Sequence, residues 1–172
     1  MHIDLEGRFV MRSYITKSRG FTLLEVLIAV VVLSIGLLGI AGLQALGQQS
    51  NHSAYLRSQA TALAYDIIDR MRANNAGVKD GDYDSIDTTA NTYNDPGCAS
   101  LMCGSSQMAQ FDMYDWQQDL SSQLPSGNGK VAGAGHGSIF TVTVMWDDDR
   151  NGSANLVCGV GSLKCFTVSS KL

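Results

Sequence analysis

An uninterrupted apolar segment stands out in the hydrophobic pattern of the chain. Between Val26 and Leu43, only Ser34 interrupts a run of Val, Leu, Ile, Ala and Gly. No Asp, Glu, Lys or Arg occurs between Glu25 and Arg57. A helix of about 20 apolar residues spans the hydrocarbon core of a bilayer, so this pattern predicts a membrane-spanning helix.

The pattern becomes amphipathic after Leu43. Apolar residues then recur at intervals of three and four and share one helical face: Leu56, Ala60, Leu63, Ile67 and Met71. Asp66 and Arg70 have the i,i+4 spacing of an ion pair. We expect one continuous helix from Phe21 to about Asn75. Residues 21–45 would form its membrane or filament-core half, and residues 46–76 its amphipathic half.

A second, shorter helix is predicted from Met108 to Leu124, because Pro125 follows directly. Five apolar residues share one face of it: Ala109, Met113, Trp116, Leu120 and Leu124. Since Trp116 lies on that face, we expect it in the core rather than on a ligand-binding platform.

Ser138 to Trp146 is the strongest predicted strand, because β-branched and aromatic residues run through it with alternating faces. Further strands are expected from about Asn155 to Cys158 and from Cys165 to Ser170. Together they predict a small antiparallel sheet whose apolar face is covered by the amphipathic half of the long helix. The expected fold class is therefore α+β, with residues 77–172 as the globular head.

Two segments between these elements are rich in Gly and polar residues. Gly77 to Gln107 predicts a solvated loop with a turn at Asn94–Gly97. Ser126 to Gly129 and Gly133 to Gly137 predict a flexible connector. Four acidic residues lie between Asp80 and Asp87, but no ligand spacing recurs among them. We therefore interpret them as solvated loop residues rather than as a cation site.

The charge balance argues against a nucleic-acid surface. The 172 residues include 12 Lys and Arg against 16 Asp and Glu, for a net charge of −4. Residues 1–20 hold four of the basic and two of the acidic residues, so the remaining chain is more acidic still. Nucleic-acid binding needs clustered Lys and Arg. The basic N-terminal segment is expected to stay in the cytoplasm while the rest is translocated.

Glu25 is a carboxylate inside the apolar run, where insertion into a membrane costs about 2.5–3.5 kcal/mol and calls for a partner. A signal anchor or a cleaved secretory signal would also explain an apolar N-terminal segment. However, the region from Ala41 to Ser53 offers only weak sites of the small-residue kind that follows a secretory signal.

The stretch Lys17-Ser-Arg-Gly20-Phe21-Thr-Leu-Leu-Glu25-Val resembles the type III (prepilin) signal of type IV pilins and type II secretion pseudopilins. The resemblance implies removal of residues 1–20 by a membrane prepilin peptidase, which cuts between Gly20 and Phe21, and N-methylation of Phe21. It also implies that Glu25 pairs with the N-terminal amine of a neighbouring subunit. Such pairing makes two charges tolerable in an apolar medium and would fix the axial register of the subunits.

The stretch from Ser34 to Gln44 more particularly resembles the PilV family of minor pilins, the type IV pilus modification proteins. This implies a subunit held in the inner membrane by residues 21–43, with a periplasmic head, that reaches the cell surface in the pilus. The implied partners are other minor pilins, the major pilin, the prepilin peptidase and the inner-membrane assembly platform. The implied role is to prime or promote pilus assembly for twitching motility and attachment. Pilin leaders are usually short, so Met11 is the expected natural start.

Two other functions share these features. A minor, GspI-like pseudopilin of a type II secretion system has the same N-terminal signal. An adhesive or DNA-uptake pilin would bind a ligand through its head, but the acidic balance argues against the DNA version. No nucleophile elbow, phosphate loop or HExxH motif occurs, so we expect no catalytic residue and no cofactor.

Four cysteines follow the membrane segment: Cys98, Cys103, Cys158 and Cys165. In an oxidising compartment they allow three sets of pairings. We favour the local pairs, Cys98 with Cys103 and Cys158 with Cys165, since a turn can bring the two sulfurs of each short loop within reach. Neither spacing is the C-x2-C of a zinc site.

The segment Asp147-x-Asp149-x-Asn151-Gly152 matches the first half of an EF-hand calcium loop. The bidentate acid expected six residues after the glycine is Cys158 instead. A hairpin loop with an Asn-Gly turn explains the same residues, so we expect no metal site here.

Overall fold

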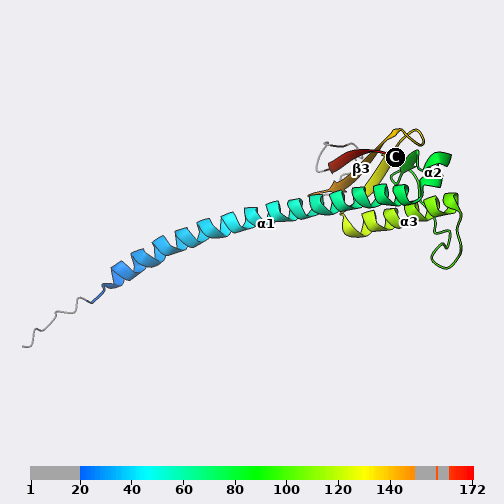
Figure 1. Ribbon diagram of the computed structural model, residues 1–172. Coiled ribbons are helices and arrows are strands. Elements are labelled where there is room, and N and C mark those ends of the chain that lie inside the picture. Colours follow the sequence, from blue (N-terminus) through cyan, green and yellow to red (C-terminus); the bar gives the residue numbers. More distant parts are fainter. Residues whose placement is uncertain (1–19, 150–157, 159–162) are drawn as a thin grey trace, which may run out of the picture. The chain divides into compact units, whose positions relative to one another are not determined.

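The computed structural model describes residues 20–149, 158 and 163–172. Along the chain it has the elements α1 (Leu23–Ala73), α2 (Asn75–Asp80), β1 (Ser85–Asp87), α3 (Ser105–Gln123), β2 (Asn128–Ala132), β3 (Ile139–Asp147) and β4 (Leu163–Lys171) (Figure 1). The chain divides into two compact units, residues 1–46 and 47–172. Helix α1 contributes its first half to one unit and its second half to the other.

In the first unit, α1 begins directly after Thr22, whose side-chain oxygen accepts a hydrogen bond from the backbone N–H of Glu25 at 3.3 Å. This contact satisfies one of the N–H groups that lack a partner at a helix start. Every residue from Gly20 to Leu46 is exposed in the chain on its own. By length and composition, α1 is able to cross a membrane, as predicted.

The second unit contains a four-stranded antiparallel sheet in the order β1-β2-β3-β4. The predicted strand from Ser138 to Trp146 is confirmed as β3, which pairs with β2 on one side and with β4 on the other. Alternate side chains of β3, those of Phe140, Val142 and Val144, are fully buried. The sheet therefore has one face against the core, which is typical of an antiparallel sheet in an α+β fold.

The second half of α1, helix α3 and the inner face of the sheet form a single core. All five residues of the predicted apolar face of α1 are buried, and so are all five of the second helix: Leu56, Ala60, Leu63, Ile67, Met71, Ala109, Met113, Trp116, Leu120 and Leu124. Trp116 lies in the core as predicted, and its indole Nε1–H donates to the carbonyl oxygen of Leu63 at 2.9 Å. The α+β fold with a long N-terminal helix is thus confirmed (Figure 1).

Two segments that we expected to be loops contain regular structure. Gly77–Gln107 includes most of α2, which stops at Gly81 in the left-handed conformation (φ 82°), and all of β1. The connector expected at Ser126–Gly129 and Gly133–Gly137 overlaps the start of β2, and the rest of β2 lies between its two segments. In β2, the position of Gly129 leaves no room for a side chain, because a Cβ there would lie 2.2 Å from the ring of Trp116. The local composition of this segment predicts turns, but contact with α3 and pairing with β3 stabilise β2 as a strand.

The element bounds differ slightly from those predicted. Helix α3 begins at Ser105 rather than Met108, and the side-chain oxygen of Gln107 accepts the backbone N–H of Gly104 at its start. The strand expected at residues 155–158 falls mostly outside the described residues, and Cys158 itself lies in a turn.

Candidate functional site

The start of α1 presents a carboxylate among exposed apolar side chains. Phe21 is 81% exposed, and Glu25 lies in the first helical turn. A negative charge in that turn is stabilised by the positive end of the helix dipole. Phe21, Glu25 and four apolar residues of the next two turns line a shallow groove along one side of the helix: Val26, Ala29, Val30 and Leu33. Its surface is suited to a positively charged group carried on an apolar partner.

The large apolar side chains that follow Glu25 are all exposed from Val26 to Leu46. An apolar surface of this extent is not stable in water and marks a contact with lipid or with other protein. Ser34 adds no polarity to it, because its hydroxyl donates to the carbonyl oxygen of Val30 at 2.7 Å. At Gly36, Gly39 and Gly42, no other atom lies within 4 Å of the place that a side chain would take, so a close helix could pack against them.

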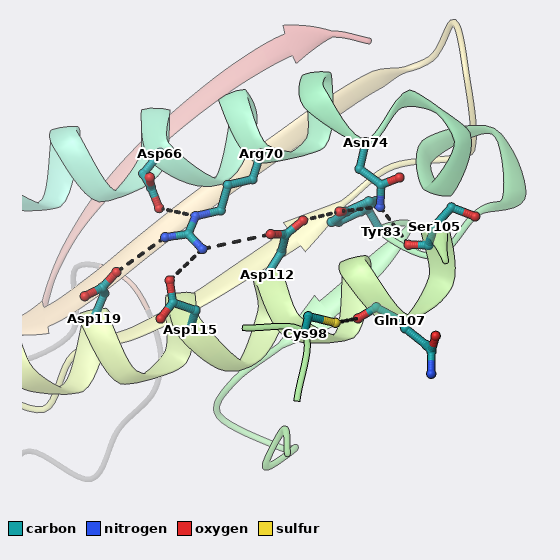
Figure 2. A network of polar contacts seen from close by, with 10 residues as sticks. All are labelled: Asp66, Arg70, Asn74, Tyr83, Cys98, Ser105, Gln107, Asp112, Asp115 and Asp119. Carbon is teal, nitrogen blue, oxygen red and sulfur yellow. Dashed lines mark hydrogen bonds and ion pairs between the residues drawn. The ribbon is translucent and has the colours of Figure 1, made fainter. Parts of the chain in front are cut away.

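A second set of polar groups lies in the second unit, residues 47–172, where Arg70 of α1 faces α3 (Figure 2). Its guanidinium contacts Asp66 at 2.7 Å, as the i,i+4 spacing predicted, and Asp115 at 2.6 Å. Asp119 and Asp112 lie at 3.7 and 3.9 Å. Burial alone would lower the pKa of Arg70, but the hydrogen bonds to Asp115 and Asp66 outweigh it and raise that pKa. One cation therefore holds carboxylates from two helices.

The polar set continues from Asp112 through Tyr83 to Asn74 (Figure 2). The hydroxyl of Tyr83 donates to Asp112 and accepts from the side-chain amide of Asn74 at 3.0 Å. The same amide donates to the carbonyl oxygen of Ser105 at 2.7 Å. Burial raises the pKa of Tyr83, so it remains a protonated donor, and burial also raises the pKa of Asp112. These contacts tie the end of α1, the segment after α2 and the start of α3 together.

This network joins elements and has no arrangement typical of catalysis. Each carboxylate pairs with a donor of the network, and Asp112 also lines an open pocket together with Arg70 and Asn74. Within the described residues, no group of three or more His, Cys, Asp and Glu side chains is arranged to hold a metal ion. Of the calcium-loop residues, Asp147 is buried, Asp148 accepts from Ser53 at 2.7 Å, and residues 150–152 lie outside the described part.

Two disulfides lie in the head. Cys98 bonds to Cys103 with an S–S distance of 2.04 Å, and Cys158 bonds to Cys165 with an S–S distance of 2.11 Å. These are the two local pairs that the sequence favoured. The second disulfide attaches Cys158 to strand β4, while the first closes a short loop just before α3.

Two family models match adjacent parts of the chain. Residues 15–41 match a model described as the prokaryotic N-terminal methylation motif. Residues 42–114 match a model described as Type IV pilin Tt1218. The chain has the fold and the N-terminal signal of a type IV pilin. Comparisons with curated proteins and with solved structures give no significant match.

A pilin-type role follows from this similarity. The type IV pilin family is structural rather than enzymatic. A prepilin motif implies processing by a prepilin peptidase and association with other pilus components in general. The motif and the apolar helix of this chain together fit membrane anchoring followed by pilus assembly.

The structure also contains polar contacts that were not predicted from the sequence. Thr22 and Glu25 have the spacing of an N-terminal capping box, which could have located the helix start. Asp112, Asp115 and Asp119 recur at intervals of three and four, so they share one face of α3. That spacing indicated an acidic stripe, but nothing in the sequence indicated that Arg70 of α1 would face it.

Proposed function

We propose that this chain is a minor pilin of a type IV pilus, similar to PilV, and that it acts by subunit association to prime or promote pilus assembly. The observation that supports this most is the prepilin motif directly before an exposed apolar helix, with Glu25 in the first helical turn. The proposed organisation is a leader at residues 1–20, a membrane and filament-core helix at residues 21–45, an amphipathic half at residues 46–76 and a periplasmic head at residues 77–172.

The first proposed step is processing. Prepilin peptidase removes the leader by cleavage between Gly20 and Phe21, and Phe21 is then N-methylated. Both residues are exposed in the chain on its own, and α1 begins two residues after Phe21, so the scissile bond precedes the helix. An extended or irregular segment fits a peptidase active site more easily than a helical one does. Mass measurement of the mature N-terminus tests this step, and retention of residues 1–20 would contradict it.

The second proposed step is association through α1. After cleavage, the new amine of Phe21 on one subunit and the carboxylate of Glu25 on its neighbour form an ion pair in an apolar medium. An unpaired charge there is costly, so the pair favours one axial register over others. The groove beside Glu25 has the apolar lining that such a neighbour requires. The proposed partners are other minor pilins, the major pilin and the inner-membrane assembly platform, and the disulfide-bonded head would reach the cell surface with the fibre.

The alternative is a minor, GspI-like pseudopilin of a type II secretion system, and one experiment separates the two. In an in-frame deletion strain, surface pili are counted by electron microscopy and secreted exoproteins are assayed in the same cultures. Sparse or absent pili with normal secretion is the expected result. Normal pili with exoproteins retained in the periplasm would contradict the minor-pilin proposal and favour the pseudopilin. Complementation with the full chain is the control.

A further inference from the structure

The loop closed by the Cys98–Cys103 disulfide presents two adjacent large apolar side chains to solvent. Met102 is fully exposed and Leu101 is 65% exposed. Among the described residues of the second unit, the other exposed large apolar side chains are those of Tyr55, Tyr65 and Ile139, and they are separated from one another in sequence. Two neighbouring exposed side chains of this kind, outside the membrane helix, indicate a contact with another molecule.

The backbone of this loop is held in one shape. Gly97 has a positive φ of 80°, and its N–H donates to the side chain of Asp95 at 2.7 Å. Its carbonyl oxygen accepts the N–H groups of both Ser100 and Leu101 at 3.1 Å. The sulfur of Cys98 also lies 3.6 Å from the carbonyl oxygen of Gln107 in α3 (Figure 2). Because the loop is already ordered, little conformational entropy is lost when Leu101 and Met102 are covered.

The segment that carries the loop indicates the chemistry of its partner. Arg70 and Asp112 line a pocket with Cys103 at the end of the loop, and they form an ion pair with each other. No Asp, Glu, Lys or Arg occurs from Pro96 to Phe111, although the chain as a whole is acidic. Depletion of charge and enrichment of Met are typical of the centre of a protein interface. Binding to nucleic acid or to an anionic lipid surface would instead need Lys or Arg beside the apolar residues.

The loop lies at the end of the head where α1 ends. Ser105, two residues after Cys103, accepts through its carbonyl oxygen the side-chain amide of Asn74, which directly follows α1. Figure 1 shows the segment before α3 at this end, beside the end of α1. Within the head, the loop is therefore presented at the end opposite to residue 47, where the chain enters.

We infer that the Cys98–Cys103 loop is a docking element, whose Leu101 and Met102 side chains insert into an apolar depression on the head of another pilin subunit. The inference rests on the proposed function and locates the head-to-head contact which that function requires. Two side chains cover far less than the roughly 800 Å² per partner of a standard interface. This contact is therefore weak alone, and it becomes effective because subunits that already associate through α1 are held at high local concentration.

Site-specific photo-crosslinking in the full-length chain tests this contact in cells that assemble pili. The photoreactive residue p-benzoylphenylalanine replaces Met102, Ile139 as a matched exposed apolar control, or Leu33 in the apolar helix. The expected result is an adduct from position 102 whose peptides map to the head of another pilin, with no such adduct from position 139. An adduct with lipid only, with a protein other than a pilin, or with equal yield at both head positions would overturn the inference.

The crosslinking result at position 33 distinguishes a failure of this inference from a failure of the proposed function. Pilin adducts from position 33 but none from position 102 would overturn the docking element and leave the minor-pilin proposal intact. No pilin adduct from either position would count against both.

Substitution provides an independent measurement. The double variant Leu101→Asp with Met102→Asp is expected to lower the amount of this chain in sheared pili by about tenfold, a loss typical of an interface anchor. Ile139→Asp, which adds one charge at a position as exposed as Leu101, should leave that amount unchanged. Non-reducing electrophoresis and resistance to protease verify that each head is folded. Equal incorporation of the double variant and of Ile139→Asp would contradict the inference.

Discussion

Arg70 shows how a single side chain sets the charge balance between two helices. It is the cation nearest to four carboxylates, and its side chain is only 23% exposed. Solvent screens such a group less than a surface ion pair, so removal of the cation leaves its partners repelling one another. The stability of the contact between α1 and α3 should therefore depend on Arg70 far more than on exposed arginines nearby.

Substitution of Arg70 tests this dependence. Arg70→Met is expected to destabilise the head by about 2–4 kcal/mol, because Asp66, Asp115 and their neighbours lose their common cation. Thermal unfolding of the purified full chain in detergent, followed by near-ultraviolet circular dichroism, measures the change. Arg72→Met is the matched control, since Arg72 is exposed and pairs with exposed Asp69, and it should change stability by less than about 1 kcal/mol. Equal losses in the two variants would contradict the assignment.

The lowered pKa of Asp87 predicts how the stability of the fold changes at acid pH. Partial burial would raise its pKa, but hydrogen bonds from Thr89 and Lys130 lower it to about 2. A carboxylate with a lowered folded-state pKa stabilises the fold above its ordinary pKa, and this contribution is lost as the pH falls from about 4 towards about 2. Asp87→Asn removes that dependence. After solvent screening we expect the wild type to lose about 1 kcal/mol more than Asp87→Asn between pH 5 and pH 2.

Thermal unfolding at a series of pH values measures this difference. Lys130→Met is an informative companion, because it removes the ion pair, leaves the two hydrogen bonds from Thr89 and should show an intermediate acid loss. If the wild type and Asp87→Asn lose stability in parallel across this range, the ion pair with Lys130 makes no net contribution.

At the scale of elements, α3 and β2 depend on each other through a close approach. The ring of Trp116 lies against the backbone of Gly129, and its indole nitrogen is hydrogen-bonded to α1. The ring is thereby fixed between a helix and a strand and cannot move aside. A protein core is packed too densely to absorb an added methyl group at such a point.

Gly129→Ala is therefore expected to destabilise the head by about 2 kcal/mol or more, since its Cβ would overlap the Trp116 ring. Gly104→Ala is the matched control, because no atom lies within 4 Å of a side chain added there. Comparison of the two melting temperatures, together with Trp116 fluorescence as a local signal, measures the effect. A Gly129→Ala variant as stable as Gly104→Ala would show that the ring is free to shift.

The same elements show what the sequence could and could not predict. Periodicity identified the buried faces of α1 and α3, because a helix repeats its inner positions every three or four residues whatever it packs against. It also identified β3, whose β-branched run is long. It failed for β1, which has only three residues, and for β2, which contains Asn, Gly and Lys. Pairing of β1 with β2 and of β2 with β3 stabilises these strands, and local preference does not.

At the scale of the whole molecule, the two halves of α1 differ in what their apolar side chains contact. Residues of α1 up to Leu46 expose apolar side chains on every side, whereas Leu56 to Met71 direct theirs into the core of the head. The N-terminal signal was recognisable because its residues must be adjacent in the chain. The Arg70 network was not, since its carboxylates come from segments about 45 residues apart.

Glu25 belongs to this scale, because its proposed role appears only between subunits. Glu25→Ala is expected to leave cleavage and the folding of the head unchanged, and to lower incorporation into pili by about tenfold or more, since a neighbouring amine would remain unpaired. N-terminal mass, protease resistance of the head and immunoblots of sheared pili measure the three properties. Glu25→Asp, which keeps the charge, should recover part of the incorporation. Normal incorporation of Glu25→Ala would refute the register role.

The position of β4 in the sheet has a consequence for the order of events during synthesis. Helix α1 is synthesised before the sheet, and β3 has no partner on one side until β4, from Leu163 to Lys171, has been made. The backbone N–H of Gly137 also bonds to the carbonyl oxygen of Leu172 at 2.6 Å. The sheet is therefore complete only after the last-made strand is present. In a chain that lacks β4, β3 would become the edge strand in its place, and its nine-residue row of unpaired backbone groups is a template for aggregation.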